Sequence, residues 1–281
     1  MKTSAASSRD SSRTQATSNI LVTGSSGVVG RRVVRELRRR GIGDRVVEFS
    51  GDVSSREAVR EFVTHAGPIG ACIHLAAVVP VATVDADPVR AFEVNALGTG
   101  HIIDEIGRQS GDPYVLHCST SHVYAASGQP LHESAPVEPV STYGRSKLAG
   151  EFLASDIAAI RSVRLGIARV FSLWAEDQKG SFLYPSVMAR FSAANLGDSV
   201  QVMGGNNIRD FLHADEVARL LVELLAREAL GVVNVASGEP TAVIDFAEAH
   251  APGGIVVRSD DVAVPTSIVA DTTRLKEVLS G

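Results

Sequence analysis

Short apolar runs alternate with longer amphipathic segments along most of the chain. From Asn19 onward the apolar runs are rich in β-branched residues, which is typical of buried strands, and the segments between them carry apolar residues at helical spacing. The expected strands are 20–23, 45–49, 71–75, 114–118 and 163–171, and the expected helices are 28–40, 54–66, 87–109 and 141–160. This order predicts an α/β fold, a Rossmann-type doubly wound parallel sheet covered by helices on both faces.

After Phe171 the alternation of strand-like and helix-like segments becomes less regular. The chain is therefore divided at this residue into a longer and a shorter part. Residues 19–171 are expected to form a dinucleotide-binding Rossmann domain, and residues 172–281 a small C-terminal substrate lobe with strand and helix contributions that return to the sheet. The elements expected in that lobe are 200–202, 214–227 and 232–235. Residues 1–18 hold six serines and almost nothing apolar, so a disordered N-terminal tail is predicted there, with an organelle transit peptide as the weaker alternative.

Composition narrows the class of protein. The chain has 281 residues, of which 44% are hydrophobic, and a net charge of -5, so nucleic acid is not an expected partner. No apolar stretch approaches the ~20 residues that span a bilayer, so no membrane partner is expected and a cytoplasmic enzyme is the simplest class. Two cysteines exclude a disulfide-built scaffold. No metal site is predicted, because alternation along a strand directs the side chains of His117 and Cys118 to opposite faces.

Three glycines stand where the first strand becomes the first helix, in the sequence Gly24-Ser25-Ser26-Gly27-Val28-Val29-Gly30. A tight turn, a close approach of pyrophosphate to the backbone and packing of the helix on its strand all favour glycine at such positions. The N–H groups of the first helical turn would then face the phosphate charge. This placement predicts a dinucleotide-binding site, and a glycine-rich turn without a ligand is the alternative.

An acidic residue that binds the adenosine ribose should follow about 20 residues later. Glu48 lies 18 residues after Gly30, at the end of the second strand, and would favour NAD over NADP. An ordinary charge at a strand end explains Glu48 equally well. Arg31 and Arg32 would instead pair with a 2′-phosphate, so the cofactor is predicted as NAD or NADP, with NAD slightly favoured.

Tyr143 and Lys147 are four residues apart within a predicted helix, which places both on one face, one turn apart. A free tyrosine is a poor base at neutral pH, but a nearby ammonium stabilises the phenolate and lowers the pKa of the phenol. Such a tyrosine can exchange a proton with a substrate oxygen while hydride moves on carbon.

Several motifs recur together between Asn19 and Leu279. They are the glycine loop after Thr23, Gly51-Asp52-Val53, His74-Leu75-Ala76-Ala77, Asn95-Ala96-Leu97-Gly98-Thr99, Ser119-Thr120-Ser121-His122-Val123-Tyr124, Tyr143 with Lys147, Arg209-Asp210-Phe211-Leu212-His213 and Asn234-Val235-Ala236-Ser237-Gly238. With these motifs the chain resembles the extended short-chain dehydrogenase/reductases, in particular the NAD-dependent epimerase/dehydratase family of nucleotide-sugar enzymes.

The resemblance implies a role for each matching position. Tyr143 would be the acid/base, with Lys147 as its partner and as a ligand of the nicotinamide ribose, and Thr120 would hydrogen-bond the reacting oxygen. The other implied cofactor contacts are Asp52 and Val53 against the adenine, Ala76 and Ala77 on the nicotinamide side, and Asn95 as a supporting residue. The implied substrate contacts are Thr120, Ser121, His122, Ser172 and Arg209, of which Arg209 would clamp a diphosphate. A surface ion pair with Asp210 or a neighbouring residue is the alternative for Arg209.

Parts of the sequence depart from the family pattern, and these departures change what is expected of the fold and the site. Ser121-His122 stands where dehydratases of this family have Asp-Glu, so dehydration is not expected. His122 is expected to face solvent, and a role as an extra acid/base is the alternative. Between the first helix and Gly51-Asp52-Val53 there is room for one strand, so one βα unit is predicted to be missing, which puts adenosine binding in doubt. Trp174 lies in a segment that departs from the family pattern and is expected to fill core.

The expected function is NAD(P)-dependent oxidoreduction of a nucleotide sugar, either epimerisation through a keto intermediate or reduction of a 4-keto sugar. One alternative is a reductase of a non-nucleotide ketone in secondary metabolism. Another is a non-catalytic cofactor-binding protein of the same fold. The resemblance also implies a homodimer formed through helices 88–109 and 141–160.

Overall fold

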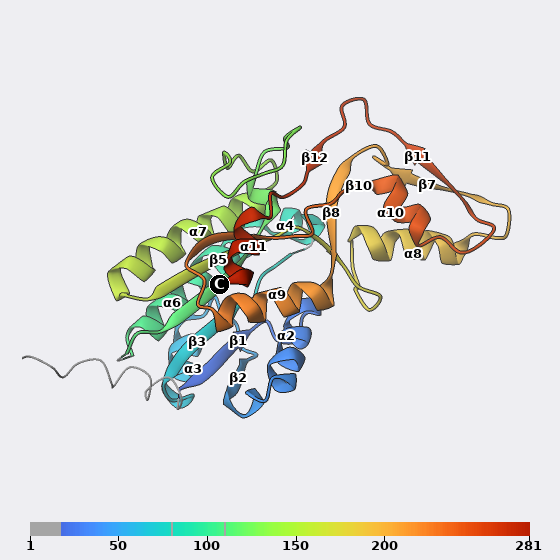
Figure 1. The fold of residues 1–281 in the computed structure, drawn as a ribbon. Helices are drawn as coiled ribbons and strands as arrows, with labels where there is room; N and C mark the ends of the chain where they lie inside the picture. Colours follow the sequence, from blue (N-terminus) through green and yellow to red (C-terminus); the bar gives the residue numbers. More distant parts are fainter. Residues whose placement is uncertain (1–17, 80, 110) are drawn as a thin grey trace, which may run out of the picture.

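A computed structural model describes residues 18–79, 81–109 and 111–281 of the chain. Its centre is a six-stranded parallel sheet in the order β2-β1-β3-β4-β5-β9 (Figure 1). These strands are β1 Asn19–Thr23, β2 Val46–Phe49, β3 Ile69–His74, β4 Tyr114–Thr120, β5 Arg164–Val170 and β9 Gly231–Val235. The predicted doubly wound α/β fold is confirmed. The predicted tail lies outside the described residues apart from Ser18.

Helices cover both faces of this sheet. One face packs on α2 Val28–Arg39, α9 Ala214–Ala226 and α11 Thr273–Ser280 through a core of aliphatic side chains such as Leu37 and Leu221. The other face packs on α3 Arg56–His65, α6 Gly98–Gly107 and α7 Thr142–Arg161 through a second core that includes Ile103. Because all six strands are parallel, their carboxyl ends meet at one edge, where α/β proteins place their ligands.

Among the residues that the structure describes, no strand pairs with the outer side of β2. The usual doubly wound order, 3-2-1-4-5-6, has a further strand outside the second one, whereas β2 is the edge strand here and leads directly into Gly51-Asp52-Val53. The shortened βα unit predicted from the sequence is therefore confirmed.

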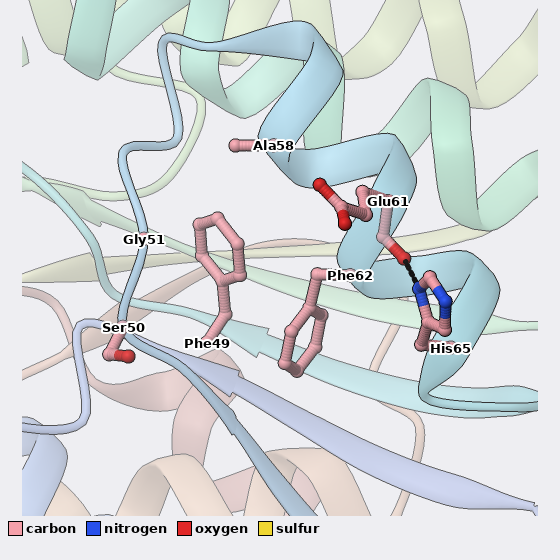
Figure 2. Close-up of a pocket in the computed structure, with 7 residues that line it drawn as sticks. All are labelled: Phe49, Ser50, Gly51, Ala58, Glu61, Phe62 and His65. Atoms are coloured by element: carbon pink, nitrogen blue, oxygen red, sulfur yellow. Dashed lines mark hydrogen bonds between the residues drawn. The ribbon is translucent and has the colours of Figure 1, made fainter.

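The uncovered edge carries a shallow pocket of about 370 Å³ between the end of β2 and α3. Figure 2 shows the rings of Phe49 and Phe62 side by side in it, with Glu61 and His65 on the next turns of α3. The two rings meet edge to face with centroids 5.0 Å apart. This contact covers apolar surface that a further strand would otherwise bury.

The helical segment that starts at Pro88 is interrupted. It consists of α5 Pro88–Phe92, a π-helical turn over Glu93–Leu97 and then α6, where an unbroken helix to Gln109 was predicted. The π turn places Asn95, which is fully buried, against α7. Gly150 permits this approach, because a β-carbon there would stand 2.5 Å from the Asn95 carbonyl oxygen.

The remaining elements form the C-terminal part, and Figure 1 shows α8, α10, β7 and β11 at one end of the molecule, beyond β8. They are β6 Ser172–Trp174, α8 Leu183–Ala193, β7 Ser199–Met203, β8 Ile208–His213, β10 Pro240–Ala242, α10 Val243–Ala249, β11 Val256–Asp260 and β12 Ser267–Ile268. Two short helical elements, α4 Val81–Ala86 and the 3-10 turn Ser121–Val123, follow β3 and β4. Within the described ranges, none of the helices has the length and apolarity needed to cross a membrane.

Candidate active site

The glycine loop closes tightly around the end of β1. Gly24 has a left-handed φ of 66°, and a β-carbon there would stand 2.7 Å from the backbone nitrogen of Ala76. A β-carbon on Gly30 would overlap the carbonyl oxygen of Gly24. The N-cap of α2 is Gly27, which offers no side chain to the first N–H groups of the helix. The backbone of the loop, a glycine cradle, therefore leaves room for an anion to approach the first turn of α2, and the pyrophosphate site itself stays a prediction.

The remaining loop residues lie where a pyrophosphate could approach them. Ser26 and Gly27 are exposed, whereas Val28 and Val29 are half-buried at the start of α2. Ala76 and Ala77 follow β3 and are also half-buried, and the backbone of Ala76 lies against Gly24. The loops at the ends of β1 and β3 are thus in contact, and the role of the two alanines beside the nicotinamide stays a prediction.

Tyr143, Lys147 and Thr120 are brought together where β4 ends against the start of α7. Ser141 caps α7 by accepting a hydrogen bond from the Gly144 N–H at 3.1 Å, which fixes the first turn that carries Tyr143. Tyr143 is 8% exposed and Lys147 is 2% exposed. The side chain of Thr120 interacts with the Tyr143 hydroxyl and acts to lower the pKa of that phenol.

Burial dominates the electrostatics of this pair. It raises the pKa of Tyr143 above its ordinary value, against the effect of Thr120, so the phenol keeps its proton in the free protein. Burial also lowers the pKa of Lys147, although Cys118 and Glu151 act in the opposite direction. Within the described part of the chain, the Lys147 ammonium has no hydrogen-bond partner. A buried, unpaired ammonium one helical turn from the phenol fits the hydroxyl groups of a nicotinamide ribose.

Asn95 supports this arrangement without reaching the reacting groups. Its amide donates to the Val78 carbonyl at 2.9 Å and to Ser146 Oγ at 3.0 Å, and its carbonyl oxygen accepts from the Val78 N–H at 2.8 Å. Asn95 therefore ties the loop after β3 to helix α7. Ser146, which lies between Tyr143 and Lys147 in the sequence, was not singled out there, because a serine in a helix gives no signal of its own.

The residues predicted to bind adenosine lie at the open edge of the sheet. Glu48 is exposed on β2 and accepts a hydrogen bond from Arg38 at 3.1 Å. Asp52 pairs with Arg90 at 2.7 Å. Desolvation acts to raise the pKa of Asp52, but two hydrogen bonds from Ser54 and the contact with Arg90 outweigh it, so the pKa is lowered. Val53 is buried against Gly98.

The two arginines after the last glycine contact carboxylates. Arg31 binds Asp177 at 2.5 Å, and Arg32, which is buried, bridges Asp177 and Asp215 at 2.7 Å each. Arg32 is therefore held by acidic residues of the C-terminal part, and its predicted alternative role as a 2′-phosphate ligand is not supported. These contacts join the helix after the cradle to the segment after β6.

The predicted substrate contacts come from the turn after β4 and from strands β6 and β8. Ser121 is buried in the 3-10 turn after β4, and His122 is exposed, as predicted, with its ring edge-on to Tyr143 at a centroid distance of 5.5 Å. Ser172 is half-buried at the start of β6. Arg209 of β8 lies near enough to His122 to lower the pKa of that imidazole, although desolvation is the larger cause.

Arg209 carries a charge that no acidic residue of the described chain neutralises. It donates to the Thr266 carbonyl and hydroxyl oxygens, both at 2.9 Å, whereas Asp210 accepts hydrogen bonds from Ser237 and Gly238. The alternative of an ion pair with Asp210 is therefore wrong. Half-buried and without a counter-ion, this guanidinium suits a phosphate group.

Two buried residues beside the site were not predicted from the sequence. Glu151, one more turn along α7 from Lys147, is buried and forms a bidentate ion pair with Arg169 at 2.7 and 3.1 Å. His117 is fully buried, and neither ring nitrogen has a partner. Glu151 continues the four-residue spacing of Tyr143 and Lys147, which was an available signal; the isolation of His117 depends on the packing around it.

Trp174 belongs to an aromatic cluster in the C-terminal part. Its ring meets His213 and His250 edge to face at centroid distances of 4.7 and 4.6 Å, with Tyr184 and Phe246 further out. Trp174 is half-buried rather than enclosed. Trp174 was predicted to fill core, and the structure confirms this only in part, because part of the indole is accessible.

Comparison with known proteins identifies the family. The model of the NAD dependent epimerase/dehydratase family matches residues 20–236. The chain belongs to this family. Membership confirms the class predicted from the sequence, an NAD(P)-dependent epimerase or reductase of the extended short-chain dehydrogenase/reductase type, with NAD or NADP as cofactor.

Individual relatives show how the family varies. GDP-6-deoxy-D-mannose reductase of Pseudomonas aeruginosa is 30% identical over 73% of this chain and 67% of its own length. The structure of MoeE5 in complex with UDP-glucuronic acid and NAD is 25% identical, covers 93% of this chain and 92% of its own, and superposes with a TM-score of 0.74. RMD from Pseudomonas aeruginosa complexed with NADPH shares the fold, with a TM-score of 0.80 at 24% identity over 94% and 93% of the two chains.

The residues of this chain fit a nicotinamide dinucleotide. The Gly24–Gly30 cradle would receive the pyrophosphate, and β-carbons at its ends would close it. The unpaired ammonium of Lys147 would receive the ribose hydroxyl groups. A group of three or more potential metal ligands is not found among residues 18–79, 81–109 and 111–281.

Proposed function

We propose that this enzyme moves hydride at a carbinol or keto carbon of a nucleotide-linked sugar, with Tyr143 as the acid/base. The observation that carries the proposal is the juxtaposition of Tyr143, Thr120 and the unpaired Lys147 at the sheet edge that also holds the glycine cradle. A protein that only bound the cofactor would need neither the phenol nor the threonine.

The roles of the side chains follow from their surroundings. The bound nicotinamide ring supplies or accepts the hydride. Tyr143 starts as a neutral phenol, so in the direction of reduction it donates a proton to the carbonyl oxygen of the substrate, which Thr120 also hydrogen-bonds. The positive charge of Lys147 stabilises the resulting phenolate, since both groups lie in a site of low polarity.

Arg209 supports a substrate with a diphosphate. Its guanidinium is half-buried and close to His122, which in turn contacts Tyr143. A diphosphate bound there would place the attached sugar toward the phenol. The relatives that bind or act on GDP-linked and UDP-linked sugars agree with this reading.

The substrate class is tested by the steady-state kinetics of Arg209→Ala. GDP-linked and dTDP-linked 4-keto-6-deoxy sugars are offered with NADH or NADPH, and consumption of the reduced cofactor is followed. Loss of a charge-assisted contact should raise KM about tenfold or more. Arg258→Ala, which changes an exposed arginine of β11, is the matched control. An unchanged KM in Arg209→Ala would point instead to a ketone without a nucleotide.

The same assay separates the two proposed reactions. A reductase consumes one reduced cofactor for each product, whereas an epimerase returns the hydride to the sugar and leaves the cofactor level unchanged. The missing strand beside β2 shortens the adenosine side of the site, which favours exchange of the cofactor and therefore reduction.

We also propose a homodimer formed through α5–α6 and α7. These helices expose large apolar side chains, among them Val89 at 69%, Phe152 at 61% and Ile160 at 74% exposed. A cytoplasmic location remains the prediction from composition.

A further inference from the structure

Two histidines lie buried close to Lys147, on the side of the central sheet that α7 covers. His74 of β3 and His117 of β4 are both fully buried, and their rings stack with centroids 5.5 Å apart. Ser119 shares a face of β4 with His117 and donates a hydrogen bond to Glu151 of α7, so this face is turned toward α7. Both histidines interact electrostatically with Lys147. The proposed reaction uses neither of them.

The hydrogen bonds of His74 occupy both of its ring nitrogens. Thr99 Oγ1 donates its one proton to the Asn95 carbonyl at 2.9 Å, so Nε2 of His74 is the donor in its 3.1 Å contact with that hydroxyl. Nδ1 of His74 then accepts from Thr23 Oγ1 at 2.8 Å. Burial, and then the charge of Lys147, lower the pKa of His74 to about 3, so the ring is neutral. His74 therefore has no lone pair left for another donor.

The hydrogen-bonding capacity of His117 is unused. Among the described residues, neither of its ring nitrogens has a hydrogen-bond partner. Burial, and then the charges of Lys147 and His74, hold the pKa of His117 well below its ordinary value, so this ring is neutral too. A neutral imidazole has one N–H donor and one nitrogen with a lone pair. A buried lone pair without a donor is costly, and the Lys147 ammonium nearby is a donor without an acceptor.

The other groups that act on the charge of Lys147 are poor or occupied acceptors. Burial raises the pKa of Cys118, so its thiol is neutral and accepts hydrogen bonds only weakly. An arginine of β5 already binds both carboxylate oxygens of Glu151. The Tyr143 phenol is protonated in the free protein. Among these groups of the described chain, His117 is therefore the one with a strong acceptor atom that nothing else uses.

We propose that His117 is a positioning residue for Lys147, one of its ring nitrogens accepting a hydrogen bond from the ammonium through a single buried water. A bridging water lets two buried groups satisfy each other where they interact electrostatically without a direct hydrogen bond. The contact directs the ammonium and keeps it charged near Tyr143. This inference rests on the proposed role of Lys147. A neutral acceptor offsets only part of the desolvation, so the pKa of Lys147 still lies below its ordinary value.

The ionisation of Lys147 in the free protein tests the contact without the reaction. The chain has four lysines, so ¹³C NMR of protein labelled at the lysine ε-carbons resolves them, and Lys147→Met assigns the signal. His117→Phe keeps a ring of similar size and removes the acceptor. The midpoint of the Lys147 titration should then fall by about one pH unit, a tenfold change in the ionisation constant. His117→Gln keeps an acceptor and should titrate close to the wild type.

Tyr114→Phe is the matched control, because it removes another buried polar group of β4, the hydroxyl that donates to the Ala229 carbonyl at 2.8 Å. Its Lys147 midpoint should equal that of the wild type. An unchanged midpoint in His117→Phe, or an equal fall in His117→Gln, would overturn the inference. Should His117→Phe not fold, the ¹⁵N shifts of the His117 ring decide. They should differ between the wild type and Lys147→Met, and identical shifts would overturn the contact.

The pH profile of hydride transfer separates this contact from the proposed function. In the direction of reduction, the alkaline limb of the rate should move to lower pH by about one unit in His117→Phe, with KM unchanged, because Lys147 must be charged to stabilise the Tyr143 phenolate. A purely structural defect would lower the rate at every pH and leave the limb in place. A lowered NMR midpoint without a moved limb would count against the role of Lys147 in the reaction, whereas an unchanged midpoint refutes the contact at any level of activity.

Discussion

At the scale of single residues, the buried ammonium of Lys147 opposes folding, and the proposed reaction depends on it. Its side chain lies 2% exposed without a hydrogen-bond partner in the described chain, and burial lowers its pKa. Between that lowered pKa and the ordinary value of 10.5, the unfolded chain binds more protons than the folded protein. Stability should therefore rise with pH across that window.

The first prediction concerns Lys147→Met, which keeps the length of the side chain and removes its charge. At neutral pH the free protein should gain about 1 kcal/mol in the free energy of unfolding while turnover is lost. The gain should shrink as pH approaches 10.5, because the wild-type lysine then loses its proton as well. Urea unfolding over a pH series measures this, with the exposed Lys179→Met as control. A variant less stable than the wild type would show that the ammonium is paired.

Residue spacing predicted that Tyr143 and Lys147 share one face of a helix, but it did not predict the buried residues behind them. Tyr143 and Lys147 follow from a four-residue interval on a helix. His117 faces the same interior because β4 pairs with β3 in the register that sets His117 beside His74, with ring centroids 5.5 Å apart. Strand register depends on the packing of the whole sheet, so this buried pair has no local signal in the sequence.

At the scale of elements, the glycine loop is held by backbone contacts that tolerate no β-carbon. We predict that Gly30→Ala lowers the free energy of unfolding by about 2 kcal/mol or more and weakens binding of NADH, since the new methyl group overlaps the Gly24 carbonyl. Gly128→Ala, where a β-carbon would meet open space, should leave both unchanged. Thermal melting and calorimetry measure the two effects. Equal stability and equal NADH affinity of the two variants would contradict the proposal that this loop binds the cofactor.

Counting residues was enough to predict the missing strand, because the interval between α2 and Gly51 has room for a single strand, β2. The π-helical turn over Glu93–Leu97 was not predictable in the same way. In this turn Asn95 forms hydrogen bonds with the Val78 backbone and with Ser146 of α7. The spacing of apolar residues along a helix gives no information about contacts between such distant positions.

At the scale of the whole molecule, residues 172–281 contact residues 19–171 through strand pairing and ion pairs. Strand β9 joins the central sheet, and Asp177 binds Arg31 and Arg32 across 146 and 145 residues of sequence. The hydrophobic pattern predicted that elements would return to the sheet. The ion pairs could not be predicted, because many acidic residues were equally available to these arginines.

A prediction at this scale concerns assembly. If α7 forms the proposed dimer interface, Phe152→Glu and Ile160→Glu should each yield a monomer, because a desolvated carboxylate without a partner opposes association. Leu196→Glu, which changes an 85% exposed leucine in the C-terminal part, should remain a dimer. Light scattering at micromolar concentration measures the mass. A wild-type monomer would refute the proposal.

The most direct test of the account is hydride transfer by Tyr143→Phe. The enzyme loaded with NADH or NADPH is mixed with a nucleotide 4-keto sugar, and oxidation of the cofactor is followed within a single turnover. Because the phenol supplies the proton and the cradle and Lys147 remain, the variant should bind the cofactor as the wild type does and transfer hydride about 100-fold or more slowly. Hydride transfer at the wild-type rate in Tyr143→Phe would contradict the account.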